Sequence, residues 1–132
     1  MILANIKRAF AYFFVLAVGL GIGTLAPKVV EGLKPTYSVG NFASYFPDSE
    51  TRVVVFGTST CPYCAATRDY LKQRNIKFLD LDVNDSETGR KQFAELNGRN
   101  VPMILIGERR IVGFRVSVLD KALKAAGIIS RN

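Results

Sequence analysis

The stretch RVVVFGTSTCPYC, residues 52–64, decides how the rest of the chain is interpreted. After Arg52 come three valines and a phenylalanine, a short apolar run that is typical of a strand buried on both faces. A Thr-Ser-Thr segment interrupts the run, and from Cys61 the spacing of apolar residues predicts a helix to about Arg74. Cys61 and Cys64 therefore lie where a strand turns into a helix.

The spacing of these two cysteines predicts thiol–disulfide chemistry. Free backbone N–H groups and the positive end of the helix dipole stabilise a thiolate at a helix start, so Cys61 is the expected nucleophile. Cys64 lies one turn further on and would resolve the mixed disulfide that Cys61 forms. Pro62 suits the first helical turn, because the N–H that it lacks would have no partner there. A passive disulfide or half of a metal site is the alternative, and the strand–helix context favours the redox pair.

Composition excludes several other chemistries. The 132 residues contain no histidine, so Ser-His-Asp catalysis, Cys-His catalysis and histidine-ligated metal sites are ruled out. With only two cysteines, one chain cannot build a four-thiolate zinc site, and we expect no metal site. The net charge is +7, but no basic run contains interleaved aromatic residues. We therefore expect a solvated basic surface and no nucleic-acid partner.

The chain beyond residue 64 continues to alternate between strand and helix patterns. The pattern predicts strands at 76–82, 103–106 and 109–112, a helix capped by Asp85 or Ser86 that ends at Gly98, and a last helix that opens with a capping-box-like Ser117-x-x-Asp120 and closes at Gly127. The order βαβαββα predicts an α/β domain over residues 51–132, a mixed four-stranded sheet with flanking helices.

The amino-terminal part of the chain has a different composition. Residues 9–27 carry no charge and match the thickness of a bilayer core when helical, so we expect one transmembrane helix. Lys7 and Arg8 precede it, which favours a cytoplasmic N-terminus (residues 1–8) and a periplasmic or other extracytoplasmic domain. Thr24-Leu25-Ala26 and Gly21-Ile22-Gly23 are both possible signal-peptidase sites, but Pro27 directly follows the first of them. The apolar run is also longer than is usual for a signal peptide, so an uncleaved signal anchor is favoured over a cleaved signal peptide.

Two further features accompany this predicted anchor. Gly19 and Gly23 form a GxxxG pair, which predicts a weak dimer of such helices. Residues 28–50 are interrupted by proline and glycine and are interpreted as a juxtamembrane linker. Its aromatic residues fit either the membrane interface or the surface of the domain: Tyr37, Phe42, Tyr45 and Phe46.

Several of these segments together resemble the glutaredoxin family of the thioredoxin fold. The resemblance covers about residues 52–127 and rests on Val53-Val54-Val55-Phe56, Cys61-Pro62-Tyr63-Cys64, Val101-Pro102 and Gly113-Phe114. It implies a thioredoxin-like fold and an oxidoreductase that acts on protein disulfides or glutathione mixed disulfides. It also implies that the Val101–Pro102 bond is cis and faces the cysteines, with the Val101 backbone offered to an extended substrate or to glutathione.

The chain departs from the family's pattern where glutathione would bind. The family usually has a basic residue at the position of Thr58 and an aspartate at the position of Val116. We therefore expect no tightly bound cofactor and only weak binding of glutathione as a co-substrate. Gly113-Phe114-Arg115 instead resembles redoxins that thioredoxin reductase reduces, which implies a thioredoxin-type or membrane electron donor. The residues expected to contact substrate or glutathione are Thr58, Tyr63, Val101, Pro102, Gly113 and Phe114.

Two functions of other classes stay open on the sequence. By resemblance to cluster-binding glutaredoxins, two chains would share a [2Fe–2S] centre through Cys61, although such members usually lack the tyrosine of the CPYC motif. A non-catalytic module, tethered to present the domain to a membrane partner, would keep its function after Cys61→Ser.

Overall fold

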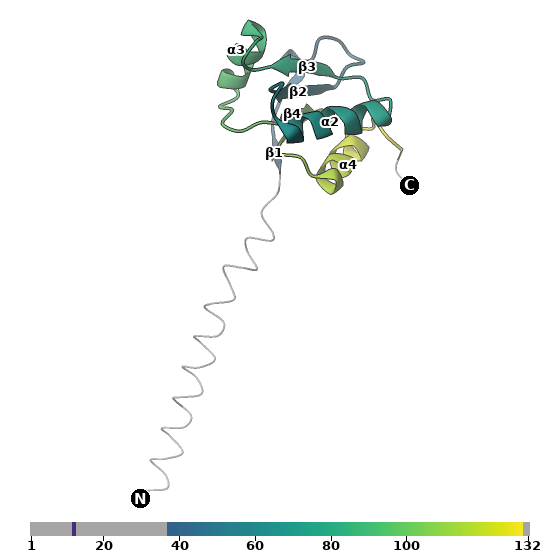
Figure 1. The fold of residues 1–132 in the computed structure, drawn as a ribbon. Helices are drawn as coiled ribbons and strands as arrows, with labels where there is room; N and C mark the ends of the chain where they lie inside the picture. Colours follow the sequence, from purple (N-terminus) through teal and green to yellow (C-terminus); the bar gives the residue numbers. More distant parts are fainter. Residues whose placement is uncertain (1–11, 13–36, 131–132) are drawn as a thin grey trace, which may run out of the picture. The chain divides into compact units, whose positions relative to one another are not determined.

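A five-stranded mixed sheet forms the centre of the computed structural model, which describes residues 12 and 37–130 (Figure 1). The strands are β1 (Tyr37–Val39), β2 (Val53–Gly57), β3 (Leu79–Asp82), β4 (Met103–Ile106) and β5 (Arg109–Val112). The helices are α2 (Pro62–Gln73), α3 (Glu87–Glu95) and α4 (Val116–Ala125), with a 3-10 helix η1 at Ala43–Tyr45. The sheet order is β1-β5-β4-β2-β3, in which only β2 and β3 run parallel.

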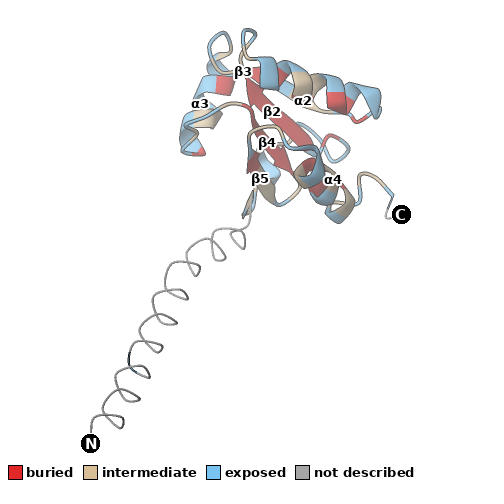
Figure 2. Cartoon of the chain, turned by 60° about the horizontal axis from the view of Figure 1, so that its bottom comes forward, coloured by how far each residue is buried: buried red, intermediate tan, exposed pale blue. Residues whose placement is uncertain are grey.

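The core lies on both faces of the two central strands, β2 and β4. Every residue of both strands is buried, as Figure 2 shows, and their unbroken apolar sequences require this placement. On one face the strands pack against α2 and α4, through the buried residues Tyr70, Leu71, Leu119 and Leu123. On the other face they pack against α3 and the residue that follows it, through Phe93 and Leu96. Because β2 is enclosed from both sides, the chain that leaves it toward α2 starts from a rigid support.

The fifth strand comes from a segment that the sequence pattern assigned to the linker. β1 pairs antiparallel with β5, with Tyr37 opposite Ile111 and Val39 opposite Arg109. The prediction of a four-stranded sheet is therefore wrong, because a three-residue strand is too short to show a periodicity. The aromatic residues of residues 37–50 pack against the core of the domain: Tyr37, Phe42, Tyr45 and Phe46.

The last helix also begins differently from the prediction. Its N-cap is Arg115, whose side chain makes no capping hydrogen bond. The capping box expected from Ser117 and Asp120 is not formed, because the helix already begins at Val116 and Ser117 lies within its first turn. The Asp120 carboxylate instead accepts the hydrogen bond of the Tyr70 hydroxyl. Asp120 also lies 3.9 Å from Nε of Arg74. The carboxylate thus ties α4 to α2 and does not close the start of its own helix.

The predicted transmembrane segment falls almost wholly outside the described residues. Of residues 1–36 the structure describes only Tyr12, so the anchor at 9–27, the Gly19–Gly23 pair and the first part of the linker stay predictions. Within residue 12 and residues 37–130, none of the helices combines the length and the apolar character that crossing a bilayer requires.

Candidate active site

Cys61 and Cys64 lie at the start of α2, directly after the loop that follows β2. Cys61 is the N-cap residue, and its Sγ accepts a hydrogen bond from the backbone N–H of Cys64, with 3.2 Å between sulfur and nitrogen. Pro62 occupies the first helical turn, as predicted. Both cysteines are free thiols; Cys61 is partly exposed, and Cys64 is completely buried. A substrate can therefore reach Cys61 before it reaches Cys64.

The two thiols are shifted in opposite directions. Partial burial would raise the pKa of Cys61, but hydrogen bonds from the Cys64 thiol and from the N–H groups of Cys64 and Tyr63 hold it below its ordinary value. The charge of Arg68 adds to this lowering. Burial, followed by the hydrogen bond to Cys61, raises the pKa of Cys64 to about 11. Cys61 is thus the thiol that ionises first and the better nucleophile near neutral pH.

Arg68 is a charged neighbour of the thiols that the sequence analysis did not select. Its Nε donates to Asp80 Oδ2 at 2.8 Å, and its Nη1 donates to the carbonyl oxygen of Thr58 at 3.2 Å. A Cβ placed on Gly57 would lie 3.1 Å from both Arg68 Nη2 and Cys64 Sγ, so the guanidinium and the thiol border the same small space. The sequence contained one indication of this contact: Arg68 lies four residues after Cys64, a spacing that puts both side chains on one face of a helix.

The Val101–Pro102 peptide bond is cis, as the resemblance implied. Met103, the residue after this bond, pairs with Phe56 near the end of β2. The cis bond therefore lies beside the loop that leads from β2 to the cysteines. Val101 is partly exposed, whereas Pro102 is buried. Tyr63, the second residue of α2 and between the two cysteines, is exposed.

Gly113 and Phe114, which were both expected to contact substrate or glutathione, make different contacts in the structure. Gly113 follows β5 with a φ of +85°, and its N–H donates to the Pro102 carbonyl at 2.8 Å. It therefore supports the cis bond directly, in a conformation that favours glycine. Phe114 packs edge-on against Tyr70, with 6.1 Å between the ring centroids, and so contacts α2 and the core.

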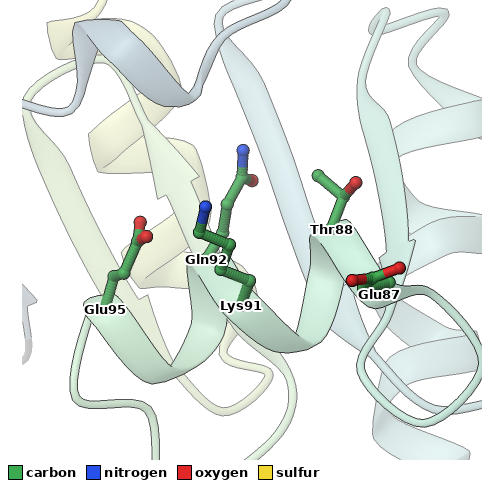
Figure 3. Close-up of a pocket in the computed structure, with 5 residues that line it drawn as sticks. All are labelled: Glu87, Thr88, Lys91, Gln92 and Glu95. Atoms are coloured by element: carbon green, nitrogen blue, oxygen red, sulfur yellow. The ribbon is translucent and has the colours of Figure 1, made fainter.

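A separate pocket of about 370 Å³ lies along α3 (Figure 3). It is lined by Glu87, Thr88, Lys91, Gln92 and Glu95. All of these residues belong to α3, so the pocket is not part of the dithiol site. Among residues 12 and 37–130, no three side chains of the metal-binding types come together to form a metal site.

Comparisons with known proteins agree with this geometry. The family model described as Glutaredoxin matches residues 53–111. The chain is 37% identical over 73 residues to an uncharacterized glutaredoxin-like 8.6 kDa protein in the rubredoxin operon of Clostridium pasteurianum, a match that covers 54% of this chain and 97% of that protein. It is 29% identical over 80 residues to a glutaredoxin of Pseudomonas aeruginosa, covering 59% of this chain and 95% of that one.

Solved structures show the same fold. The crystal structure of a glutaredoxin from Archaeoglobus fulgidus superposes with a TM-score of 0.52 and 21% sequence identity, covering 64% of this chain and 96% of that chain. A thioredoxin-like protein superposes with a TM-score of 0.50 at 22% identity, covering 54% of this chain and 99% of the other. The described domain therefore has a thioredoxin-like α/β fold.

Proposed function

This chain belongs to the glutaredoxin family, whose members are thiol–disulfide oxidoreductases, and we propose that Cys61 is its nucleophile and Cys64 its resolving thiol. The observation that carries the proposal is the contrast between the two sulfurs. Cys61 is partly exposed at a helix start and accepts the N–H of Cys64, whereas Cys64 is fully buried behind it. Cys61 is accessible to a substrate disulfide, whereas Cys64 can attack only a mixed disulfide that has already formed on Cys61.

The reaction proceeds through a mixed disulfide. The Cys61 thiolate attacks one sulfur of the substrate disulfide, and the other substrate sulfur leaves as a thiolate and takes up a proton. Cys64 then loses its proton and attacks Cys61 Sγ, which closes the Cys61–Cys64 disulfide and releases the second substrate sulfur. Two electrons pass from the cysteine pair to the substrate. Val101, partly exposed before the cis bond, has its backbone available to an extended substrate.

The surface around this pair favours protein disulfides over glutathione. Val112 and Val116 are 42% and 43% exposed, and Tyr63 is 66% exposed. Val112 lies opposite Met103, the residue after the cis bond, so this apolar surface adjoins the site. Neither Thr58 nor Val116 supplies the charge with which the family usually holds glutathione. We therefore propose a protein substrate and a protein dithiol, of thioredoxin type or in the membrane, as electron donor.

Localisation is the remaining part of the proposal. Residues 9–27 would anchor the chain, and the charges of Lys7 and Arg8 favour a domain on the extracytoplasmic side. In an oxidising compartment the pair rests as a disulfide unless a donor reduces it. An electron donor in the membrane would keep the Cys61–Cys64 pair reduced.

The function is tested with two single substitutions in an assay that reduces a disulfide-bonded peptide. We expect Cys61→Ser to lower turnover to background, because no other thiol is exposed at the helix start. We expect Cys64→Ser to accumulate a mixed disulfide on Cys61 that is visible by mass spectrometry. Full reducing activity of Cys61→Ser would contradict the assignment of Cys61 as the nucleophile. If the unchanged protein reduces no disulfide and Cys61→Ser keeps its function in cells, the non-catalytic module is favoured instead. A visible chromophore that Cys61→Ser removes would favour the shared iron–sulfur cluster instead.

A further inference from the structure

The resolving step requires a thiolate on the most buried sulfur of the site. Cys64 is completely buried, and a buried anion is costly without a cation or hydrogen-bond donors nearby. Besides burial, the pKa of Cys64 responds to Cys61, to the backbone of Thr58 and to the charge of Arg68. Arg68 is the cation in this set, and the chain contains no histidine that could act as a base.

The Arg68 guanidinium is held in one orientation next to the Cys64 thiol. Nε is bound to Asp80 and Nη1 to the Thr58 carbonyl, which fixes the plane of the group. A Cβ atom placed on Gly57 would lie 3.1 Å from Arg68 Nη2 and also 3.1 Å from Cys64 Sγ. The nitrogen and the sulfur are therefore separated by no more than twice that distance. The Arg68 side chain is only 16% exposed, so water screens its charge less than that of a surface cation.

Gly57 keeps this space open. It is the last residue of β2, and any side chain there would start 3.1 Å from both the guanidinium nitrogen and the sulfur. Asp82, which pairs with Gly57 across the strands, faces the guanidinium together with Asp80. Arg68 is thus the cation that acts on Cys64 beside Cys61, while the two carboxylates of β3 act on Arg68.

We propose that Arg68 is a positioning residue for the resolving step, in which its guanidinium, oriented by Asp80 and the Thr58 carbonyl, stabilises the thiolate of Cys64. The inference rests on the proposed function. In this step the Cys64 proton passes to water, a bond forms between Cys64 Sγ and Cys61 Sγ, and the bond from Cys61 Sγ to the substrate sulfur breaks. The substrate thiolate that leaves takes up a proton.

The test uses the full chain with two substitutions of Arg68 and a matched control. Arg68→Met removes the charge and keeps the approximate length of the side chain. Arg68→Lys keeps the charge but loses the planar guanidinium that donates to Asp80 and to the Thr58 carbonyl at the same time. Lys72→Met removes the same charge from an exposed position one turn further along α2. The first readout is the lifetime of the mixed disulfide with a peptide disulfide, measured by rapid quenching and mass spectrometry at several pH values.

We expect Arg68→Met to lengthen the life of the mixed disulfide about tenfold, the effect of one pKa unit on the thiolate fraction of Cys64. Arg68→Lys should recover part of that loss, and Lys72→Met should stay within about twofold of the unchanged protein. A second readout is the pKa of Cys64 in a Cys61→Ser background, followed by the ¹³Cβ chemical shift. The pKa should rise in Arg68→Met and not in Lys72→Met.

An unchanged lifetime and an unchanged Cys64 pKa in folded Arg68→Met protein would overturn the inference. If Arg68→Met does not fold, Asp80→Asn takes its place. Asp80→Asn keeps the Arg68 guanidinium but removes the carboxylate charge that orients it. We expect this variant to lengthen the life of the mixed disulfide by less than Arg68→Met would. An unchanged lifetime in Asp80→Asn would count against a role for Arg68. If the unchanged protein forms no mixed disulfide on Cys61, the proposed function fails, while the pKa of Cys64 still decides whether Arg68 stabilises its thiolate.

Discussion

At the scale of single residues, the site separates two chemically identical thiols by position alone. Cys61 accepts an N–H at the helix start, and Cys64 is buried one turn later under the loop that Arg68 holds. The sequence predicted that Cys61 lies at the helix start and Cys64 further into the helix, because the CPYC spacing after a buried strand sets these positions locally. It did not predict Arg68, because the contact with the Thr58 carbonyl depends on how the loop folds back over α2.

The same scale carries a prediction about glutathione. We expect the chain to turn over a glutathione mixed disulfide poorly, and Thr58→Lys combined with Val116→Asp to raise this activity about a hundredfold. Two charge-assisted hydrogen bonds at about 1.5 kcal/mol each account for that factor if their effects add. Neither change should unfold the domain, since Arg68 binds the backbone of residue 58, and an acidic residue suits the first turn of α4.

The measurement compares turnover of glutathione mixed disulfide with reduction by a thioredoxin-type donor. Val39→Asp is the control, because this valine is 67% exposed on β1, at the end of the strand away from the site. It should leave both activities unchanged. Efficient glutathione turnover by the unmodified chain, unaltered by the double substitution, would contradict the prediction and place the chain with glutathione-dependent glutaredoxins.

At the scale of elements, the predictable and unpredictable parts of the fold differ in the range of the interactions that form them. β2, β4 and β5 and the three helices have local patterns, and Ser86 caps α3 as one of the two expected residues. β1 forms by pairing with the open edge of β5, and the Asp120 side chain on α4 binds the Tyr70 hydroxyl on α2. Neither partner is near in the sequence.

The element that begins with β1 carries a stability prediction. Phe46→Ala should lower the free energy of unfolding by about 1–3 kcal/mol, because this ring packs partly buried against the cluster on the α3 face of the sheet. The measurement is urea-induced unfolding of the full chain. Val39→Ala, at an exposed position of the same segment, should change stability by no more than about 0.5 kcal/mol. Equal stability of Phe46→Ala and the unchanged protein would show that this segment adds nothing to the domain.

At the scale of the whole molecule, strand direction relates the site to the place where the preceding chain joins the domain. Tyr37, the first residue of β1, lies opposite Ile111, and the next residue, Val112, lies opposite Met103 beside the cis bond. Tyr37 therefore lies at the end of the sheet that carries the dithiol. If residues 9–27 are an anchor, the nine residues from 28 to 36 reach at most about 30 Å. We expect such a tether to restrict the substrates to disulfides close to the membrane surface.

The topology that this expectation assumes can be measured directly. Lys7 and Arg8 should keep the N-terminus in the cytoplasm, so that Cys61 is on the outer side of the membrane. After mild reduction, a membrane-impermeant maleimide added to intact spheroplasts should label Cys61, since its thiol is partly exposed and has a lowered pKa. The substitutions Lys7→Glu and Arg8→Glu remove the positive flank and should decrease the labelled fraction, whereas Lys72→Glu on α2, far from the flank, should not. Labelling that appears only after lysis would instead place the dithiol in the cytoplasm, where its substrates would have to be sought.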